Sequence, residues 1–490
     1  MTLARDQTCE AEDLDVLVVG AGLSGIGAGY WLQAKRPTDR WAILEGRERL
    51  GGTWDLFRYP GVRSDSDMHT LGFSFRPWTS DQALADGPSI LGYIEDTARA
   101  YGIDRHIRFG TRATRAAWRS AEGRWTVETD TGGRFRCRFL YLCGGYYDYA
   151  AGHRPRWPGE AAFGGRIVHP QQWPEDLDWA GKRVVVIGSG ATAVTLTPEL
   201  ARTAAHTVML QRSPTYVVSR PGRDRLARWL HRRLPGGVTH ALVHWRNVLL
   251  QMYFYNLARR RPDWTRRRIL ADIRRRLGPD YDVDTHFSPR YAPWDQRLCL
   301  VPDADLFDAL RDGRAEVVTG DIAAFTPSGL RLTDGRELQA DVVVTATGLE
   351  LKMMGGLDLT VDGRPVKVAE RLTYKGMMLD GAPNLAFAMG YTNASWTLKC
   401  ELTSRYVCRL LDALDRRGAD WCVPQPPGPA VREQPALNLT SGYIRRGDHL
   451  LPRQGDRKPW RLNQNYALDL VALRFGAVED GVLAFGKAAA

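Results

Sequence analysis

Cysteine is scarce in this sequence, and its spacing excludes two common kinds of cysteine site. The seven cysteines are Cys9, Cys137, Cys143, Cys299, Cys400, Cys408 and Cys422. Their number is odd and no C-x-x-C pair occurs, so the sequence indicates neither a disulfide framework nor a zinc site, and we expect no metal. This usage fits a reducing compartment, and we expect a cytoplasmic protein.

Long apolar runs are missing as well. No uninterrupted apolar stretch of about 18 residues occurs, so we expect no membrane-spanning helix. The run from Val16 to Leu32 resembles the core of a signal peptide, but the segment before it carries the acids Asp6, Glu10, Glu12, Asp13 and Asp15. Because a signal peptide begins with a positive segment, this acidic leader excludes that interpretation.

Acidic residues are fewer than basic ones. Lys and Arg number 67 against 56 for Asp and Glu, which gives a formal net charge of +11. Such a surplus occurs in proteins that bind nucleic acid or an anionic membrane, and also in proteins that bind anionic cofactors. We favour the anionic cofactors and expect no nucleic-acid partner. A chain of 490 residues is long enough for two or three domains.

A glycine-rich turn near the N-terminus predicts a dinucleotide site. A buried-type strand at 15–20 leads into G-A-G-L-S-G, with Gly20, Gly22 and Gly25 at the G-x-G-x-x-G positions and helical sequence after them. The next strand ends at Glu45, where an acid can accept hydrogen bonds from a ribose. The helix N-terminus offers amide donors to phosphates. A strand before the turn and a helix after it are the context in which this glycine pattern indicates a dinucleotide-binding site.

A second glycine-rich turn repeats the pattern later in the chain. The strand 183–187 leads into G-S-G-A-T-A, a G-x-G-x-x-A turn. The candidate nucleotide contacts in this turn are Gly188, Gly190 and Thr192. The following strand ends at Arg212 and Ser213, where the first turn has its acid. An acid there would repel a 2′-phosphate, whereas Arg and Ser would bind it, so the first turn suits FAD and the second NADPH. The alternative for Arg212 is a solvated surface charge.

The segment 51–65 reads G-G-T-W-D-L-F-R-Y-P-G-V-R-S-D. Disulfide reductases of related architecture carry a redox-active cysteine pair in this region, and the absence of cysteine here excludes dithiol chemistry. Gly52, Trp54 and Asp65 are candidate site residues. The alternatives are core aromatics for Trp54 and Tyr59, and a helix cap or turn residue for Asp65.

The segment 163–174 reads F-G-G-R-I-V-H-P-Q-Q-W-P and lies between the two glycine-rich turns. Its glycines and prolines predict a loop. Taken alone, it could be a surface linker whose Trp173 covers apolar surface. The candidate functional positions are Phe163, Gly165, His169, Trp173 and Pro174.

Residues 221–290 are helical in character and rich in arginine, with aromatic residues such as Trp245, Tyr253 and Trp264 among them. We expect a helical insertion. One interpretation is a solvated basic face over an apolar packing face. The other is an amphipathic surface that makes weak contact with anionic lipid and places the protein at the membrane periphery.

Arg297 lies in Y-A-P-W-D-Q-R-L-C-L, among apolar and aromatic residues. Arginine remains charged under almost all conditions, so it needs an anionic partner or a site where negative charge forms. The structural alternative is that Arg297 pairs with Asp295 or another nearby acid to hold the fold together.

These features predict an α/β fold with two Rossmann-like dinucleotide-binding domains, for FAD and NADP, and a helical insertion in the NADP domain. The expected segments are 1–150 and 341–490 for the FAD domain and the C-terminal tail, 151–220 and 291–340 for the NADP domain, and 221–290 for the insertion. The motif W-R-L-N-Q-N-Y at 460–466 remains without an assigned role.

The order of these motifs resembles that of the class B flavoprotein monooxygenases of Baeyer–Villiger type. The resemblance rests on both nucleotide turns, the segment 51–65, the F-x-G-x-x-x-H-x-x-x-W-P spacing of 163–174 and the segment around Arg297. In the family a lysine precedes that arginine, whereas this chain has Gln296.

The resemblance implies FAD and NADPH as cofactors, with dioxygen and a small-molecule ketone or thioether as substrates. NADPH would reduce FAD, and a C4a-peroxyflavin would convert ketones to esters or lactones and thioethers to sulfoxides. Arg297 and Asp65 would be the catalytic pair, with Asp65 holding Arg297 in place. His169 and Trp173 would couple NADP(H) binding to the domain arrangement. A flavin-containing N- or S-monooxygenase and a non-catalytic FAD/NADPH-binding sensor remain as alternatives. No oligomeric state is predicted.

Overall fold

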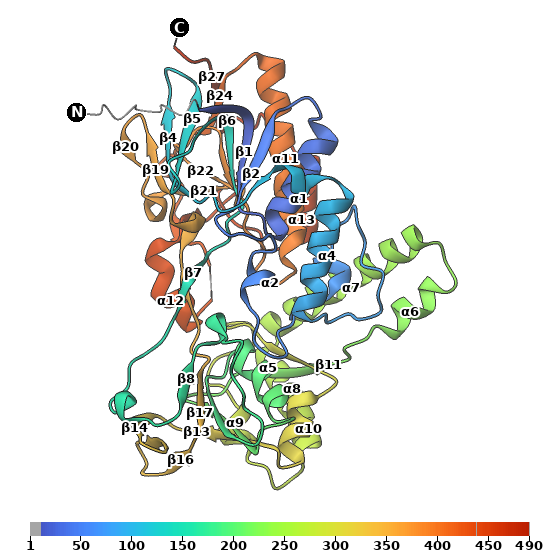
Figure 1. Cartoon of the computed structure of the whole chain (residues 1–490). Helices are drawn as coiled ribbons and strands as arrows, with labels where there is room; N and C mark the ends of the chain where they lie inside the picture. Colours follow the sequence, from blue (N-terminus) through green and yellow to red (C-terminus); the bar gives the residue numbers. More distant parts are fainter. Residues whose placement is uncertain (1–10, 438, 490) are drawn as a thin grey trace, which may run out of the picture.

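The chain folds into two α/β lobes, joined where strand β7 (Tyr147–Gly152) pairs antiparallel with β18 (Leu349–Leu351) (Figure 1). The computed structural model describes residues 11–437 and 439–489. Cys9, together with Asp6 and Glu10 of the acidic leader, lies outside the described residues.

The first lobe is built on a nine-stranded sheet of order β20-β19-β4-β5-β6-β1-β2-β3, with β23 also paired to β6. Its strands are β1 (Glu12–Val19), β2 (Trp41–Leu44), β3 (Ile107–Arg108), β4 (Ala113–Arg119), β5 (Arg124–Thr129), β6 (Arg134–Leu142), β19 (Asp358–Val361), β20 (Arg364–Pro365) and β23 (Leu385–Phe387). β1 runs parallel to both β2 and β6, and its Val16, Leu17 and Val18 are fully buried. A continuous apolar run is expected for a strand covered on both faces.

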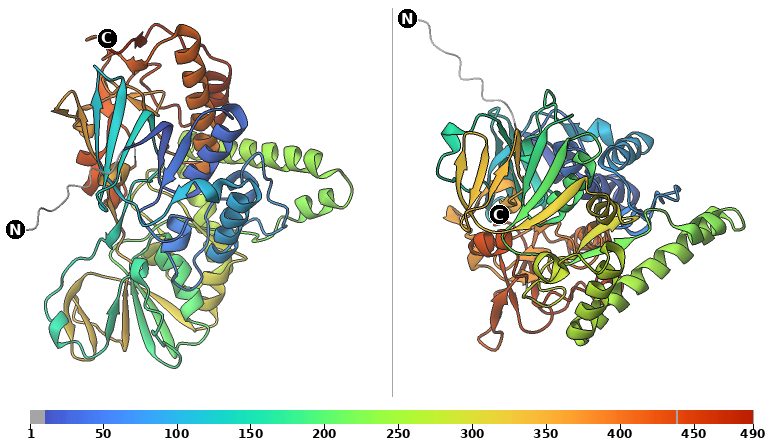
Figure 2. Two further views of the ribbon diagram at one scale, coloured as in Figure 1. Left: turned by 45° about the horizontal axis from the view of Figure 1, so that its top comes forward. Right: turned by 90° about the horizontal axis from the view of Figure 1, so that it is seen from below.

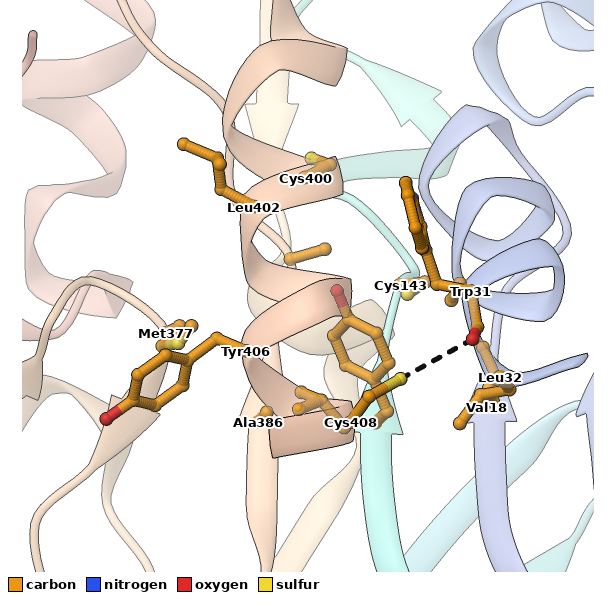
Figure 3. Close-up of a cluster of buried hydrophobic side chains, with 14 of the residues drawn as sticks. Val18, Trp31, Leu32, Cys143, Met377, Ala386, Cys400, Leu402, Tyr406 and Cys408 are labelled. Atoms are coloured by element: carbon orange, nitrogen blue, oxygen red, sulfur yellow. Dashed lines mark hydrogen bonds between the residues drawn. The ribbon is translucent and has the colours of Figure 1, made fainter. Parts of the chain in front are cut away.

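Helix α11 (Trp396–Arg417) covers the first sheet beside α1 (Leu23–Lys35), although the two are far apart in sequence (Figure 3). Leu402 and Tyr406 of α11 lie in the same apolar cluster as Trp31 of α1. The thiol of Cys408 donates a hydrogen bond to the carbonyl of Trp31 at 3.6 Å. The late part of the chain therefore completes the core around the first glycine-rich turn.

The second lobe contains a five-stranded parallel sheet of order β13-β10-β9-β17-β8. Its strands are β8 (Arg166–Val168), β9 (Arg183–Ile187), β10 (His206–Gln211), β13 (Ala315–Thr319) and β17 (Val342–Thr345). Helices α5 (Ala191–Leu200) and α10 (Asp305–Arg311) pack on it. A small antiparallel sheet lies beside it, formed by β14 (Ile322–Thr326), β15 (Gly329–Leu332) and β16 (Glu337–Gln339).

The position of β17 corrects one expected boundary. The sequence interpretation ended the NADP domain at residue 340, but β17 pairs in parallel with β8 and β9 of the second sheet. Its run of Val342, Val343 and Val344 is buried, as expected for an inner parallel strand. The chain returns to the first lobe only at β18.

The expected insertion is helical, and it contacts the first lobe as well as the second. Its helices are α6 (Arg225–His231), α7 (Gly236–Arg260), α8 (Pro262–Leu277) and α9 (Val283–Phe287). Val248 of α7 packs on Tyr391 and Leu398, and Asn247 Nδ2 donates to Asp67 Oδ1 at 2.9 Å. The end of the pair α6 and α7 stands out from both lobes (Figure 2). Among the described residues, no helix is long and apolar enough to cross a membrane.

The other elements connect these layers. They are α2 (Thr53–Leu56), α3 (Met68–Leu71), α4 (Gly87–Ala100), α12 (Gly442–Gly447), α13 (Tyr466–Arg474), β11 (Val217–Arg220), β12 (Cys299–Pro302), β21 (Thr373–Tyr374), β22 (Met378–Leu379), β24 (Trp421–Pro424), β25 (Glu433–Pro435), β26 (Arg453–Gly455) and β27 (Leu483–Gly486). β11 pairs with β12 on either side of the helical insertion, so it closes the insertion at its base.

Gly165 gives a test of the packing at the start of β8. A Cβ atom at this position would lie 2.3 Å from the carbonyl oxygen of Asp341, whereas one at Gly164 would lie 3.2 Å from that of Pro327. We expect Gly165→Ala to lower the free energy of unfolding by about 1–3 kcal/mol, because backbone must move to admit the methyl group. Gly164→Ala is the matched control and should cost clearly less in urea unfolding. Equal losses would contradict this account of the packing.

Candidate cofactor and active site

The first glycine-rich turn is too tightly packed to hold side chains at two of its three glycines. Gly20 has φ +103°, and a Cβ there would lie 2.8 Å from the carbonyl oxygen of Cys143 at the end of β6. A Cβ at Gly25 would lie 1.8 Å from the carbonyl oxygen of Gly20. Gly22 caps the start of α1. The turn therefore brings the N-terminus of α1 close to the ends of β1 and β6.

Glu45 stabilises this turn from the end of β2. Its Oε2 accepts a hydrogen bond from the backbone N–H of Ala21 at 2.8 Å, and its Oε1 accepts one from Arg47 at 3.0 Å. Burial raises the pKa of the Glu45 carboxyl, while the two amides oppose that rise. Each carboxylate oxygen has a second lone pair, so the group retains capacity for a ribose hydroxyl.

A cavity of about 420 Å³ opens in front of this turn, between the two lobes. Its volume falls within the usual range of small-molecule and cofactor sites. Eight of the predicted site residues line it together: Gly20, Gly22, Glu45, Gly52, Trp54, Asp65, Thr192 and Arg297. The other predicted residues lie elsewhere. Gly25 is behind the turn, and Arg212 and Ser213 are exposed directly after β10. Phe163 and Trp173 pack in the second lobe, whereas His169 lies against Gly152 of β7.

The segment 51–65 crosses from the first lobe to the second. A Cβ at Gly52, where φ is +57°, would lie 3.2 Å from Gly22 Cα, so this glycine lets the two loops touch. Asp55 is buried and forms ion pairs with three arginines. Tyr59 lies in the core of the second lobe, as its alternative interpretation expected. Both Tyr59 and Trp54 also line the cavity.

Arg297 faces the cavity without an acidic partner in contact. Within the described part of the chain, no ion pair or hydrogen bond to another residue involves its guanidinium. Asp65 faces the same cavity but is not ion-paired with Arg297, so the expected direct hold is absent. The structural alternative also fails, because Asp295 pairs with Arg259 at 2.6 Å instead.

Three tyrosines influence the charge of Arg297, and the sequence interpretation missed them. They are Tyr146, Tyr147 and Tyr443. Burial lowers the pKa of Arg297, but these phenols and then Asp65 raise it, and the net shift is upward from its ordinary value. The Tyr146 and Tyr147 hydroxyls lie 2.8 Å apart. Their signal in the sequence is the pair of tyrosines directly after Cys143-Gly144-Gly145, at the end of a buried strand.

Asp65 is influenced by a second arginine that the sequence interpretation also missed. Burial raises the pKa of the Asp65 carboxyl to about 6, against the lowering effects of Arg63 and Arg297. Arg63 Nη1 donates to Asp305 Oδ2 of α10 at 2.7 Å, which links the two lobes. The Nε and Nη2 atoms of Arg63 are buried and have no partner among the described residues.

The second glycine-rich turn has space where a ligand would lie. Gly188 has φ +143°, and a Cβ there would lie 2.3 Å from the carbonyl oxygen of Ala346. Gly190 is different, because it is exposed and a Cβ there would meet nothing within 4 Å. No described neighbour therefore requires a glycine at 190. A bound pyrophosphate would require one, because a side chain there would keep it from approaching the backbone. The exposed cation and hydroxyl of Arg212 and Ser213 fit a phosphate.

The loop at 163–174 holds β7, one of the two strands that join the lobes. The Gln171 and Gln172 side-chain amides donate to the carbonyls of Asp148 and Ala150 at 2.7 and 2.8 Å. The His169 ring fills the space beside Gly152, where a Cβ would lie 2.0 Å from its Cε1. Trp173 packs edge-to-face on Trp179 in the second lobe. The loop is therefore a clamp on the bridge and not a free surface linker.

Comparison with known proteins agrees with this arrangement. Residues 72–229 match a family described as flavin-binding monooxygenase-like, and residues 18–83 match an NAD(P)-binding Rossmann-like domain. The FAD-containing monooxygenase EthA of Mycobacterium tuberculosis (strain ATCC 25618 / H37Rv) is 54% identical over 480 residues, covering 97% of this chain and 98% of the relative. The protein of the same name from Mycolicibacterium smegmatis is 50% identical over 480 residues, with the same two coverages.

Two solved structures share the fold across 97% of this chain and all of their own length. An oxidized steroid monooxygenase bound to NADP superposes with a TM-score of 0.79 at 24% identity. An ε-caprolactone-bound cyclohexanone monooxygenase superposes with a TM-score of 0.75 at 21% identity. The predicted α/β fold with two Rossmann-like dinucleotide-binding domains is confirmed.

Asp65 gives a pH-dependent prediction. A carboxyl whose pKa rises from 3.8 to about 6 on folding stabilises the protein while it is protonated, and this contribution is lost as the pH rises through 6. Asp65→Asn keeps the neutral form, so it should unfold less readily than wild type above pH 6 and equally near 3.8. The gain should be about 1 kcal/mol, below the full linkage value, because the carboxyl faces a water-accessible cavity.

Urea unfolding across this pH range measures the difference between Asp65→Asn and wild type. Asp280→Asn, which alters an exposed carboxylate, is the control and should follow the wild-type pH dependence. A constant difference between Asp65→Asn and wild type at all pH values would contradict an Asp65 whose pKa is raised on folding.

Proposed function

Because the chain belongs to the family of FAD-containing, flavin-binding monooxygenases, we propose that it is an NADPH-dependent enzyme of Baeyer–Villiger type. It would convert a small-molecule ketone, dioxygen, NADPH and a proton to an ester or lactone, NADP⁺ and water. A thioether would give a sulfoxide by the same oxygen transfer. The observation that carries this proposal is the unpaired Arg297 in the cavity that opens onto the first glycine-rich turn.

The first lobe would hold FAD in this cavity. Gly20 and Gly22 let the pyrophosphate approach the N-terminus of α1, Glu45 accepts from the ribose, and Gly52 and Trp54 form the adjoining wall. When bound, FAD supplies hydride acceptance from NADPH and the activation of dioxygen.

The second lobe would hold NADPH. Gly190 leaves room for the pyrophosphate at the N-terminus of α5. Arg212 and Ser213 at the end of β10 would bind the 2′-phosphate, which NADH lacks. The clamp formed by His169, Gln171 and Gln172 would relay NADPH binding to the bridge between the lobes.

Arg297 would serve the oxygen-transfer half of the reaction. Its guanidinium faces the cavity with no ion pair among the described residues. It would therefore stabilise the negative charge that develops on reacting oxygen atoms. Asp65 would act as a positioning residue through the field it exerts on Arg297, since the two are not in contact.

Removing the Arg297 charge should separate the two halves of the reaction. We expect Arg297→Ala to bind FAD and accept hydride from NADPH. The rate at which it forms oxygenated product should fall by a factor of about 10² to 10³. The reducing equivalents should leave as hydrogen peroxide. Stopped-flow reduction, a peroxide assay and product yield on one preparation measure this split.

Arg297→Lys is the control for this experiment, because it keeps a charge but lacks the planar fork, and it should recover part of the product. Wild-type yield in Arg297→Ala would overturn the assignment. Amine or thioether oxidation without ketone oxidation would instead support an N- or S-monooxygenase. If the protein binds FAD but NADPH does not stimulate oxygen uptake, it would be a non-catalytic FAD/NADPH binder.

Cofactor choice tests Arg212. We expect the wild-type enzyme to prefer NADPH, and Arg212→Ala to raise the KM for NADPH about tenfold or more, a change of about 1.4 kcal/mol. The KM for NADH should hardly change, because NADH has no 2′-phosphate. Arg202→Ala, which removes an exposed arginine paired with Glu199 in the same lobe, is the matched control. Equal kcat/KM values for the two cofactors in the wild type would refute the assignment.

A further inference from the structure

Exposed apolar side chains gather on one projection of the molecule. Of the sixteen large hydrophobic residues that are exposed in the described chain, eleven lie between Leu226 and Trp264. We call residues 225–260, helices α6 and α7 with their connection, the α6–α7 hairpin. Its end, where α6 and α7 are connected, stands out from both lobes (Figure 2). An exposed apolar patch of this kind marks a site that contacts a membrane or another protein.

Helix α7 has two apolar sides, and only one is covered. Val243 and Val248 are buried on the inner side, toward the first lobe. The residues of the outer side recur every three or four positions, so they share one face of the helix. They are Val238, Leu242, Trp245, Leu249 and Tyr253. Leu249 and Tyr253 are 57% and 60% exposed.

The charge of this hairpin has one sign. From 225 to 262 the sequence has no acid and eight arginines. Arg232 and Arg233 lie in the connection between the helices, and Arg260 and Arg261 lie at the other end of α7. All four are exposed, and none has an ion-pair partner among the described residues. The apolar face is thus flanked at both ends by free cations.

We propose that the α6–α7 hairpin docks on an anionic lipid surface, with its outer apolar face in the headgroup and acyl boundary. Aliphatic and aromatic side chains on one face with arginine around them are the features of interfacial helices. A second copy of this chain fits less well, because an isologous contact would bring the two arginine sets together without acids to offset them.

Vesicle sedimentation of the full-length protein tests the proposal. We expect it to pellet at low salt with vesicles of equal parts phosphatidylcholine and phosphatidylglycerol, and less with phosphatidylcholine alone or at high salt. Leu242→Glu with Leu249→Glu should lower partitioning on the order of tenfold or more. Arg232→Gln with Arg233→Gln should lower binding to the anionic vesicles roughly tenfold and leave the weak binding to phosphatidylcholine unchanged.

The control pair is Leu468→Glu with Val471→Glu in α13, where both side chains are exposed but lie outside the hairpin. It should bind vesicles like the wild type. Circular dichroism melting checks that each variant is folded. If the glutamates lower the melting temperature, Leu242→Ser with Leu249→Ser replaces them.

Wild-type protein that stays in the supernatant with anionic vesicles at low salt would overturn the proposal. So would wild-type binding by the hairpin variant, or an equal loss in the control. Sedimentation equilibrium without lipid tests whether a second copy of this chain covers the face instead. A wild-type dimer that becomes monomeric in the leucine variant, together with no vesicle binding, would assign this face to a second copy.

Discussion

The antiparallel pair of β7 and β18 is the constraint on which the rest of the structure depends. The chain passes between the lobes and back through these two strands, and the cavity has walls from both lobes. His169 fills the space above Gly152, and two glutamine amides hold the backbone of β7. The hydrogen bonds at the bridge therefore help to set the position of Arg297 relative to the first glycine-rich turn, together with the Arg63–Asp305 pair.

Charges beside the cavity are treated in two different ways. Asp55 is buried and is offset by three arginines, as expected for a charge that serves the fold. Arg297 lines the cavity and has no ion-pair partner within the described residues. Its charge faces the cavity, where solvent or a ligand can reach it. This contrast distinguishes a structural charge from one available to a ligand or a reaction.

Local sequence was sufficient for the two nucleotide turns, because buried parallel strands are short apolar runs with glycine at their ends. The limits expected for 183–187 are those of β9, and Glu45 and Arg212 directly follow β2 and β10, at strand ends as expected. The sequence could not place Tyr443 beside Arg297, or Arg63 on Asp305, because those contacts join distant segments. It also could not say which apolar side of α7 is covered, because both sides have the same character.

The covered side of α7 has a consequence for how substrate supply would be measured. Val248 and Met252 line a second cavity of about 270 Å³, together with residues of the W-R-L-N-Q-N-Y segment, and Ala394 belongs to the walls of both this cavity and the cofactor cavity. A docked hairpin would place one helix thickness between the lipid and that second cavity. For a substrate that dissolves in the lipid, the relevant concentration would then be the amount per unit of membrane area. The apparent KM would therefore change when the amount of lipid is changed at constant total substrate.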